Sequence, residues 1–413
     1  MEEEEEDVMS AQGSERLHGL DAVRGYALML GVVFHAALSF LPGPQAWVVK
    51  DVETSALIAG VAYVSHMFRM TTFFLIAGFF ARLVFQRRGQ AGFVKDRLTR
   101  IGLPLVVGWP VIFPLLVGAI IYGAFVANGG QMPKGPPPAL PSQPGAFPLT
   151  HLWFLYVLLW FYAAALVVRG LVARLDGEGR LRAGADRVVA ALVRSPLAPL
   201  ALALPVVIAF HLFRPWTLWF GVPTPDQNLI PTLPAAVEYG LAFGFGWLLH
   251  RQPDLLQVWR GRWPLNLSLA IALTAACLSI VGLDNAVATA EPGWTTSAYA
   301  ALYGLAIWTW TFAAIGLALR FLSDHSPVRR YIADSSYWVY LVHLPLVVAL
   351  QAWVSRFGWP AEVKIVVVLG IAFPILFGSY QLLVRHTFVG AVLNGRRTPR
   401  PAKALASQPE TAA

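Results

Sequence analysis

The chain of 413 residues is strongly apolar: 57% of its residues are hydrophobic and only 13% are charged. Soluble domains carry about 25% charged residues, so the composition excludes an ordinary soluble enzyme and indicates an integral membrane protein. Its single cysteine, Cys277, lies in an apolar run, which excludes disulfide frameworks, cysteine zinc sites and CxxC redox chemistry. The net charge of +8 is uninformative until the basic residues are located.

Apolar runs long enough to cross a membrane recur along nearly the whole chain. A hydrocarbon core of about 30 Å requires roughly 20 apolar residues per helix. The runs predict an all-α polytopic membrane protein with about ten transmembrane helices, which we place near residues 20–41, 56–85, 98–127, 150–169, 196–213, 233–250, 264–283, 297–320, 333–354 and 362–386. We expect one membrane domain over residues 16–387, a disordered acidic tail over 1–15 and a disordered cytoplasmic tail over 388–413.

The basic residues divide unevenly between the loops that these spans define. Of the 31 Lys and Arg residues, 24 fall on one side, five on the other, and Arg24 and Arg69 lie inside spans. This asymmetry predicts that both chain termini are cytoplasmic. The first apolar run lacks a cleavage pattern, so we expect it to remain as an anchor. Because the basic residues flank helix ends and form no stacking or groove-reading pattern, nucleic acid is not an expected partner.

The first span contains two ionisable residues, Arg24 and His35, which are expensive to bury in a membrane. Eleven residues of helix are three turns, so both side chains share a face about 16 Å apart along the axis. One interpretation has Arg24 pairing with an anionic donor near the cytoplasm and His35 acting as a base deep in the membrane. In the alternative, Arg24 snorkels to the interface and His35 makes a structural hydrogen bond between helices.

The second span places Arg69 near its middle, with His66 one turn away on the same face. A cation at that depth needs an anionic partner. Glu238 in the sixth expected span is one candidate, and a phosphate of a bound substrate is the other. We therefore count His66, Arg69 and Glu238 as candidate substrate-binding residues.

Polar side chains near the outer half of the predicted bundle are the remaining candidates. In the ninth span Ser336, Tyr340 and His343 follow at i, i+4 and i+7, hence on one face. A Tyr–His pair relays protons or orients a sugar, but a structural link between helices is the favoured interpretation. His151 opens the fourth span among aromatic residues, a setting typical both of a membrane interface and of carbohydrate sites.

These motifs together resemble a known family. Arg24, ten intervening residues and His35 are similar to the R-x10-H signature of the membrane acyltransferase family often called acyltransferase 3. Further similar segments are FRMTTFFLIAGFFARL at 68–83, RLTRIGLPL at 97–105, HLWFLYVLL at 151–159 and SSYWVYLVHLPLV at 335–347. Within the family, LHGLDAVRG, HMFRMTTFFLIAGFFAR and HLWFLY resemble the glucan biosynthesis protein C type, which is associated with succinylation of periplasmic glucans.

The resemblance implies an O-acyltransferase of the bacterial cytoplasmic (inner) membrane. A cytoplasmic acyl-CoA, with a succinyl or acetyl group, is expected to bind with its phosphates against Arg24, Arg69 and the basic segment 82–100. The acceptor, a hydroxyl of a periplasmic or surface glycan, is expected to approach near His151 and the Pro-rich segment 129–148. His35 then removes the hydroxyl proton, or less readily carries the acyl group itself.

The same resemblance implies neither a metal nor a permanently bound cofactor, and it makes glycan-synthesis proteins the expected protein partners. Two other functions fit the composition. One is a transporter or exporter of a glycan or anionic substrate, although the paired repeats and broken helices typical of transporters are not evident in the sequence. The other is a non-catalytic scaffold of a polysaccharide machine, in which Arg24, His35 and Arg69 serve unrelated contacts.

Overall fold

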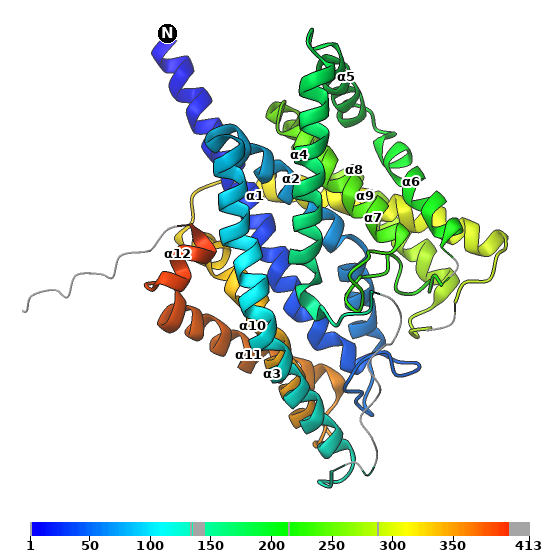
Figure 1. Cartoon of the computed structure of the whole chain (residues 1–413). Coiled ribbons are helices and arrows are strands. Elements are labelled where there is room, and N and C mark those ends of the chain that lie inside the picture. The colour runs from blue at the N-terminus through cyan, green and yellow to red at the C-terminus, as the bar shows by residue number, and fades with distance from the viewer. Residues whose placement is uncertain (1, 133, 135–144, 214, 287–288, 396–413) are drawn as a thin grey trace, which may run out of the picture.

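The computed structural model describes residues 2–132, 134, 145–213, 215–286 and 289–395. These residues form α-helices and short 3₁₀ or π turns, and within them β-structure is limited to two isolated bridges. The helices, shown in Figure 1, are α1 (Glu2–Ala37), α2 (Ala56–Arg97), α3 (Leu103–Ala127), α4 (Trp153–Leu175), α5 (Arg180–Arg194), α6 (Ala198–Leu212), α7 (Leu233–Leu249), α8 (Leu256–Val281), α9 (Trp294–Phe321), α10 (Pro327–Val354), α11 (Ala361–Ser379) and α12 (Phe388–Asn394). The predicted all-α membrane fold is confirmed.

Local sequence explains where several helices begin and bend. Ser55 caps α2 by accepting a hydrogen bond from the Ile58 amide, and Ser326 caps α10 in the same way. The helical run that starts with α2 changes direction at Gly89, whose φ of 67° lies in the left-handed region that favours glycine. It then continues through the π turn η2 (Leu98–Gly102) into α3.

Seven helical stretches of the described residues are long and apolar enough to cross a membrane, or eight if the pair α5 and α6, bent by 107°, forms one span. One stretch, 56–127, contains both the second and the third expected spans. The helix α7 lies where the span 233–250 was expected, but it has only 17 residues. The polytopic architecture is therefore confirmed. The count of ten transmembrane helices and the cytoplasmic location of both termini remain predictions.

Helical segments extend into both of the segments expected as tails, whose bounds and disorder stay predictions. The helix α1 begins at Glu2, within the segment 1–15. At the other end, the segment expected as a tail begins with α12, while residues 396–413 lie outside the described part of the chain.

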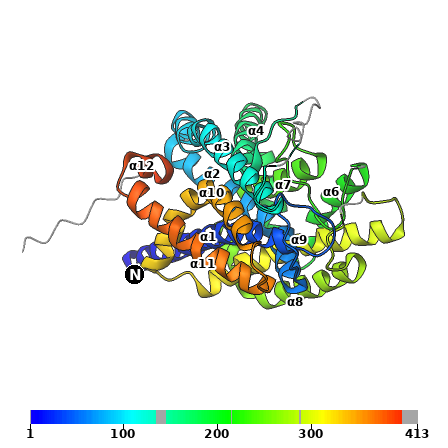
Figure 2. The same ribbon diagram turned by 90° about the horizontal axis from the view of Figure 1, so that it is seen from below.

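The bundle is organised around α1, which packs against α2, α9, α10 and α11. Figure 2 shows α1 running through the middle of the molecule between these helices. The helices α2 and α7 approach closely because Gly78 faces the Phe243 carbonyl and Gly246 faces the Leu75 carbonyl, where any Cβ would clash. This packing places polar residues of α1, α2, α7 and α10 in the interior of the helix bundle.

Candidate functional site

Three histidines from different elements gather around the end of α1. His35 lies in the last turn of α1, and its Nδ1 is 2.9 Å from Nε2 of His343 in α10. The two rings stack with centroids 5.1 Å apart. His151, in the 3₁₀ turn η3 (Thr150–Leu152) that precedes α4, packs edge-on against His343 at 5.1 Å. His35 therefore lies in the last turn of α1 but inside the candidate membrane span 18–40, and its depth in the membrane stays a prediction.

The hydrogen-bond partners of His343 and His35 determine which ring nitrogen of each histidine carries the proton. Nδ1 of His343 is 2.7 Å from the backbone carbonyl of Tyr340, which only accepts, so this nitrogen carries the proton. In a neutral His343, Nε2 is then the acceptor, and Nδ1 of His35 must donate to it. The lone pair of His35 consequently lies on Nε2, the nitrogen that faces away from His343. His35 is oriented as a base.

The position of His35 is fixed by two residues that the sequence patterns did not single out. The side-chain amide of Gln351 donates to the carbonyls of His35 at 2.8 Å and Ala36 at 3.0 Å, in the last turn of α1. Trp47 donates its indole N–H to Gln351 at 3.0 Å and stacks on the His35 ring at 5.7 Å. Neither residue belongs to a recognisable motif, because Trp47 comes from the loop after α1 and Gln351 from the far end of α10.

The loop that carries Trp47 is itself held by a buried ion pair. Nζ of Lys364, in α11, is 2.6 Å from Asp51, and the two side chains are 0% and 1% exposed. In the sequence, Lys364 stands at the start of the last expected span and counts among the five basic residues of the less basic side. Its position two residues before the apolar run VVVLG was the available signal that it begins a buried helix. This ion pair connects α11 to the segment over His35.

Arg69 and His66 belong to α2 and pack against Phe34, the residue before His35 in α1. The Arg69 guanidinium sits 4.6 Å from the centroid of the Phe34 ring and next to Gly31, one turn before His35. Its contact with the Leu30 carbonyl is long, at 3.5 Å, and none of the described carboxylates forms an ion pair with it. His66 stacks on Phe34 at 5.1 Å, and its buried Nδ1 has no hydrogen-bond partner within the described residues.

Glu238 does not compensate Arg69. The carboxylate is fully buried in α7 and accepts a hydrogen bond from the Thr71 hydroxyl at 3.0 Å. The arginine–glutamate pair that is the usual structural way to bury such a cation is therefore not formed. Of the two partners that the sequence allows for Arg69, Glu238 is therefore excluded, and its carboxylate links α7 to α2.

The polar face of α10 contacts backbone groups of η3 and of α10 itself. The Tyr340 hydroxyl donates to the His151 carbonyl at 2.6 Å, and the His343 ring contacts the Tyr340 backbone rather than its hydroxyl. Ser336 donates to the Ala333 carbonyl within its own helix. His151 donates its Nε2 proton to the Leu341 carbonyl at 3.0 Å. Tyr340 and His151 thus fix α10 against η3, and the only ring-to-ring hydrogen bond in this cluster joins His35 and His343.

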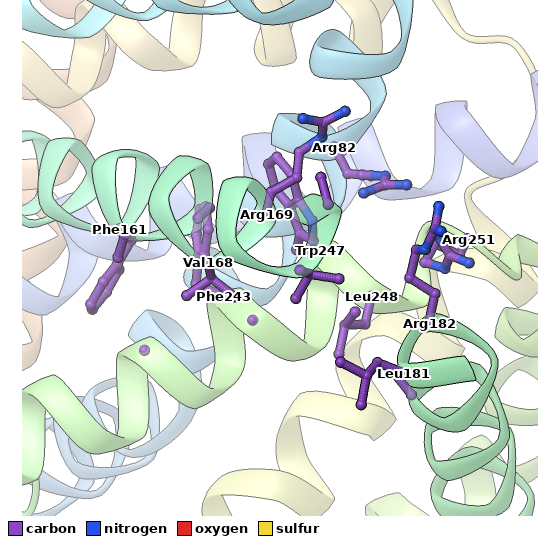
Figure 3. A pocket seen from close by; sticks show the side chains of 17 residues that line it. Arg82, Phe161, Val168, Arg169, Leu181, Arg182, Phe243, Trp247, Leu248 and Arg251 are labelled. Carbon is purple, nitrogen blue, oxygen red and sulfur yellow. The ribbon is translucent and has the colours of Figure 1, made fainter. Parts of the chain in front are cut away.

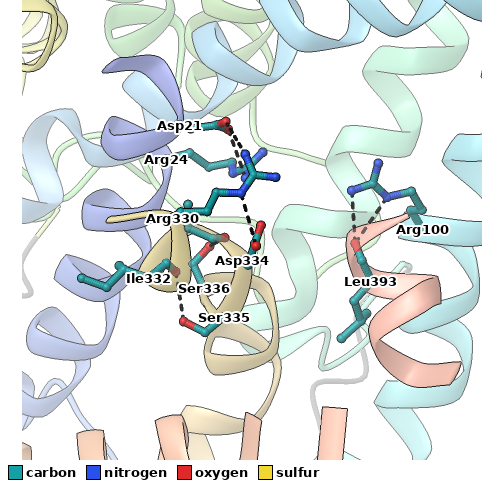
Figure 4. Close-up of polar contacts among 10 residues, drawn as sticks. Asp21, Arg24, Arg100, Arg330, Ile332, Asp334, Ser335, Ser336 and Leu393 are labelled. Atoms are coloured by element: carbon teal, nitrogen blue, oxygen red, sulfur yellow. Dashed lines mark hydrogen bonds and ion pairs between the residues drawn. The ribbon is translucent and has the colours of Figure 1, made fainter. Parts of the chain in front are cut away.

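Arg24 lies three turns before His35 in α1, near the start of the candidate membrane span 18–40. It forms an ion pair with Asp21 at 3.2 Å, and its side chain is 37% exposed. Arg330 of α10 bridges Asp21 at 3.9 Å and Asp334 at 3.3 Å. Figure 4 shows this network, with Arg100 nearby bound through two nitrogens to the Leu393 carbonyl. The anion beside Arg24 in the structure is therefore a carboxylate of the same helix.

The fold and the site together define a class of protein: a polytopic α-helical membrane protein with three clustered histidines at the end of a helix and an arginine three turns earlier on that helix. A family model described as an acyltransferase domain matches residues 17–383. The chain belongs to this family of integral membrane acyltransferases.

Curated relatives match a smaller part of the chain. The glucans biosynthesis proteins C of Escherichia coli (strain K12 / DH10B), Escherichia coli O1:K1 / APEC and Escherichia coli O9:H4 (strain HS) are each 29% identical over 154 residues. The matched residues are 37% of this chain and 38% of each relative, so the chain spans less than half the length of these proteins. No solved structure matches the chain.

Proposed function

We propose that the protein is an O-acyltransferase of the bacterial inner membrane that transfers an acyl group from cytoplasmic acyl-CoA to a glycan hydroxyl on the outer side. The observation that supports this reaction most strongly is the orientation of His35, whose Nδ1 is held by His343. That contact leaves Nε2 as the free base of the cluster. The printed name of the relatives favours a glucan as the acceptor.

The proposed chemistry is direct transfer. Nε2 of His35 takes the proton of the glycan hydroxyl as the hydroxyl oxygen attacks the thioester carbonyl. The new C–O bond forms, the C–S bond breaks, and the proton passes from His35 to the departing CoA thiolate. His343 holds the His35 ring in place and stabilises its charged form, because the 2.9 Å hydrogen bond strengthens when His35 becomes an imidazolium.

Arg69 supplies the contact for an anionic acyl group. It is 6% exposed and lacks a paired carboxylate among the described residues, so a buried positive charge stands next to the base. A succinyl group carries a carboxylate that satisfies this cation, whereas an acetyl group does not. Between these two donors, the site favours succinyl-CoA.

Arg24 is assigned to the donor's phosphates at the cytoplasmic end. Its side chain is more than one-third exposed, so a phosphate from solution exchanges with Asp21 without a large desolvation cost. Arg100 and Arg330 lie close enough to add positive charge to this end of α1. The distance along α1 between Arg24 and His35, about 16 Å at 1.5 Å per residue, is spanned by the pantetheine arm of an extended CoA.

The experiment that tests this function compares glycans from cells with and without the protein. Mass spectrometry of periplasmic glucans and surface glycans identifies the acyl group and the acceptor together. We expect succinyl esters on the glucans only when the wild-type protein is present, and we expect none with His35→Ala produced at equal membrane levels. Esters that persist with His35→Ala would remove His35 as the base. Unchanged glycans in all strains would argue for a transporter or a scaffold instead.

A further inference from the structure

A cavity lies at the end of the bundle where the basic residues gather, away from the cluster of His35, His151 and His343. It occupies about 410 Å³ between α4 and α7, beneath α5 and the middle of α2. Its walls are apolar, with Val168 and Val172 from α4 and Phe243 and Trp247 from α7. Four arginines surround one end of it: Arg82, Arg169, Arg182 and Arg251. Figure 3 shows their guanidinium groups together beyond Trp247, with the rings of Phe161 and Phe243 along the rest of the cavity.

Small residues keep this cavity open along the helices. Gly240 and Gly244 line it from α7, and a Cβ built on Gly244 would meet no atom within 4 Å. Phe161 closes the end of the cavity opposite the arginines by packing against Phe243, with ring centroids 5.7 Å apart. From Phe161 to Arg169 the helix rises by about 12 Å, at 1.5 Å per residue. The cavity is therefore a groove along α4 that can hold part of a hydrocarbon chain.

Two of the four arginines already have carboxylate partners. Arg251 makes a bidentate ion pair with Asp186 of α5, at 2.6 and 2.7 Å. Arg182 contacts Asp176 through Nε at 2.9 Å. These pairs attach α5 to α7 and to the end of α4, and they add no net charge to the cavity.

Arg82 and Arg169 are left without such compensation. Neither forms an ion pair with a carboxylate of the described residues, although Asp186 faces Arg82 while both its oxygens are bound by Arg251. The Arg82 guanidinium lies 5.6 Å from the Trp247 ring, and that of Arg169 lies 4.2 Å from Phe85. Nε of Arg82 is buried and has no hydrogen-bond partner within the described chain. Two positive charges thus stand at the mouth of an apolar groove.

We propose that this groove binds an anionic phospholipid of the cytoplasmic leaflet. The phosphate lies between Arg82 and Arg169, and one acyl chain runs along the groove between α4 and α7. Basic pockets between membrane helices on the cytoplasmic side are suited to anionic headgroups, and the apolar lining matches the attached chain. A zwitterionic lipid leaves one more positive charge uncompensated there than an anionic lipid does.

The groove does not serve the acyl donor. Its inner end is sealed by aromatic contacts, with Phe161 against Phe74 at 5.3 Å and Phe74 against Tyr239 at 4.9 Å. This aromatic layer separates an acyl chain in the groove from Arg69 and His35. Apart from the arginines the walls offer few hydrogen-bonding groups for a nucleotide. The proposal is therefore independent of the transferase reaction, and it can hold whether or not that reaction is correctly assigned.

Native mass spectrometry of the full-length protein in lipid vesicles tests the proposal. The protein is reconstituted with mixtures of phosphatidylglycerol and phosphatidylcholine, extracted and examined for retained lipid. We expect the wild-type protein to retain phosphatidylglycerol. The double substitution Arg82→Gln with Arg169→Gln should reduce retention at least about tenfold, because each charge-assisted contact is worth a factor of that order. Arg174→Gln, an exposed arginine of the same helix outside the groove, serves as the matched control and should retain lipid normally.

A second variant tests the groove separately from the charges. Gly244→Leu places a side chain in open space and should displace the lipid chain while the fold is kept, which thermal unfolding verifies. Retention of phosphatidylglycerol at the wild-type level by both Gly244→Leu and the double arginine variant would overturn the proposal. So would displacement of the lipid by excess CoA, together with weaker CoA binding in the arginine variant, because the arginines would then bind the phosphates of the donor.

Discussion

Two parts of α1 use positive charge in opposite ways. Close to His35, Arg69 lacks a carboxylate among the described residues, and Nε2 of His35 faces away from His343. Three turns earlier in α1, Arg24 and Arg330 share the carboxylates of Asp21 and Asp334. A buried cation without a partner is costly, so under the proposed function the part close to His35 is the one that needs a ligand from outside the chain. The ion pairs around Arg24 are partly exposed, so they exchange partners at low cost.

Among the variants that test this comparison, a substitution of Arg69 is expected to have the largest effect on transfer activity. Arg69→Gln should lower kcat/KM for succinyl-CoA about 100-fold, because loss of a buried charge-assisted contact costs about 2–5 kcal/mol. Transfer from acetyl-CoA should fall much less, since that donor has no carboxylate to bind. Steady-state kinetics with the two donors measure the difference, and Arg356→Gln, outside the site, is the control. Equal losses with both donors would show that Arg69 does not read the acyl group.

His343 should have the next largest effect. We expect His343→Gln to lower kcat about tenfold or more with little change in KM, because the proton on Nδ1 of His35 is no longer fixed by a ring nitrogen. In a His35→Ala background the same substitution should add almost nothing, since both residues act as one unit. Independent, additive losses in the double variant would mean that His343 acts apart from His35.

Arg24 and Asp21 should shift donor binding in opposite directions. Arg24→Gln removes a phosphate contact and should raise KM for acyl-CoA several-fold, up to about tenfold, with kcat nearly unchanged. Asp21→Asn removes the competing carboxylate and should leave KM the same or lower it. Donor titrations with both variants measure these changes. If both substitutions weaken donor binding equally, the ion pair serves the structure of α1 and not the donor.

The smallest effect on catalysis, but a clear effect on stability, is expected from the buried pair of Lys364 and Asp51. Lys364→Met leaves the Asp51 carboxylate buried without its cation and should lower the free energy of unfolding by about 3 kcal/mol. Lys364→Met combined with Asp51→Asn should recover most of that loss. Chemical denaturation in detergent measures both. A double variant as unstable as the single one would contradict the pairing as the source of the effect.

Much of this architecture is readable from the sequence, for physical reasons. Long apolar runs fix the helices, and the rarity of ionisable residues in them points to Arg24, His35 and Arg69. Contacts between distant segments are not encoded in any spacing. The hydrogen bond between His35 and His343 joins positions 308 residues apart, and Gln351 reaches α1 from 316 residues away. Likewise, the sequence offered Glu238 for Arg69, but the packing of α2 on α7 directs that carboxylate to Thr71.

The central claim, that His35 is the base, is tested most directly by single-turnover transfer from labelled succinyl-CoA to glucan in vesicles that contain the purified protein. We expect His35→Ala to slow transfer by about 10²- to 10⁴-fold at unchanged donor affinity, the range for loss of a general base. His211→Ala, which replaces an exposed histidine of α6, should transfer at the wild-type rate. Transfer by His35→Ala at the rate of the His211→Ala control would contradict the claim.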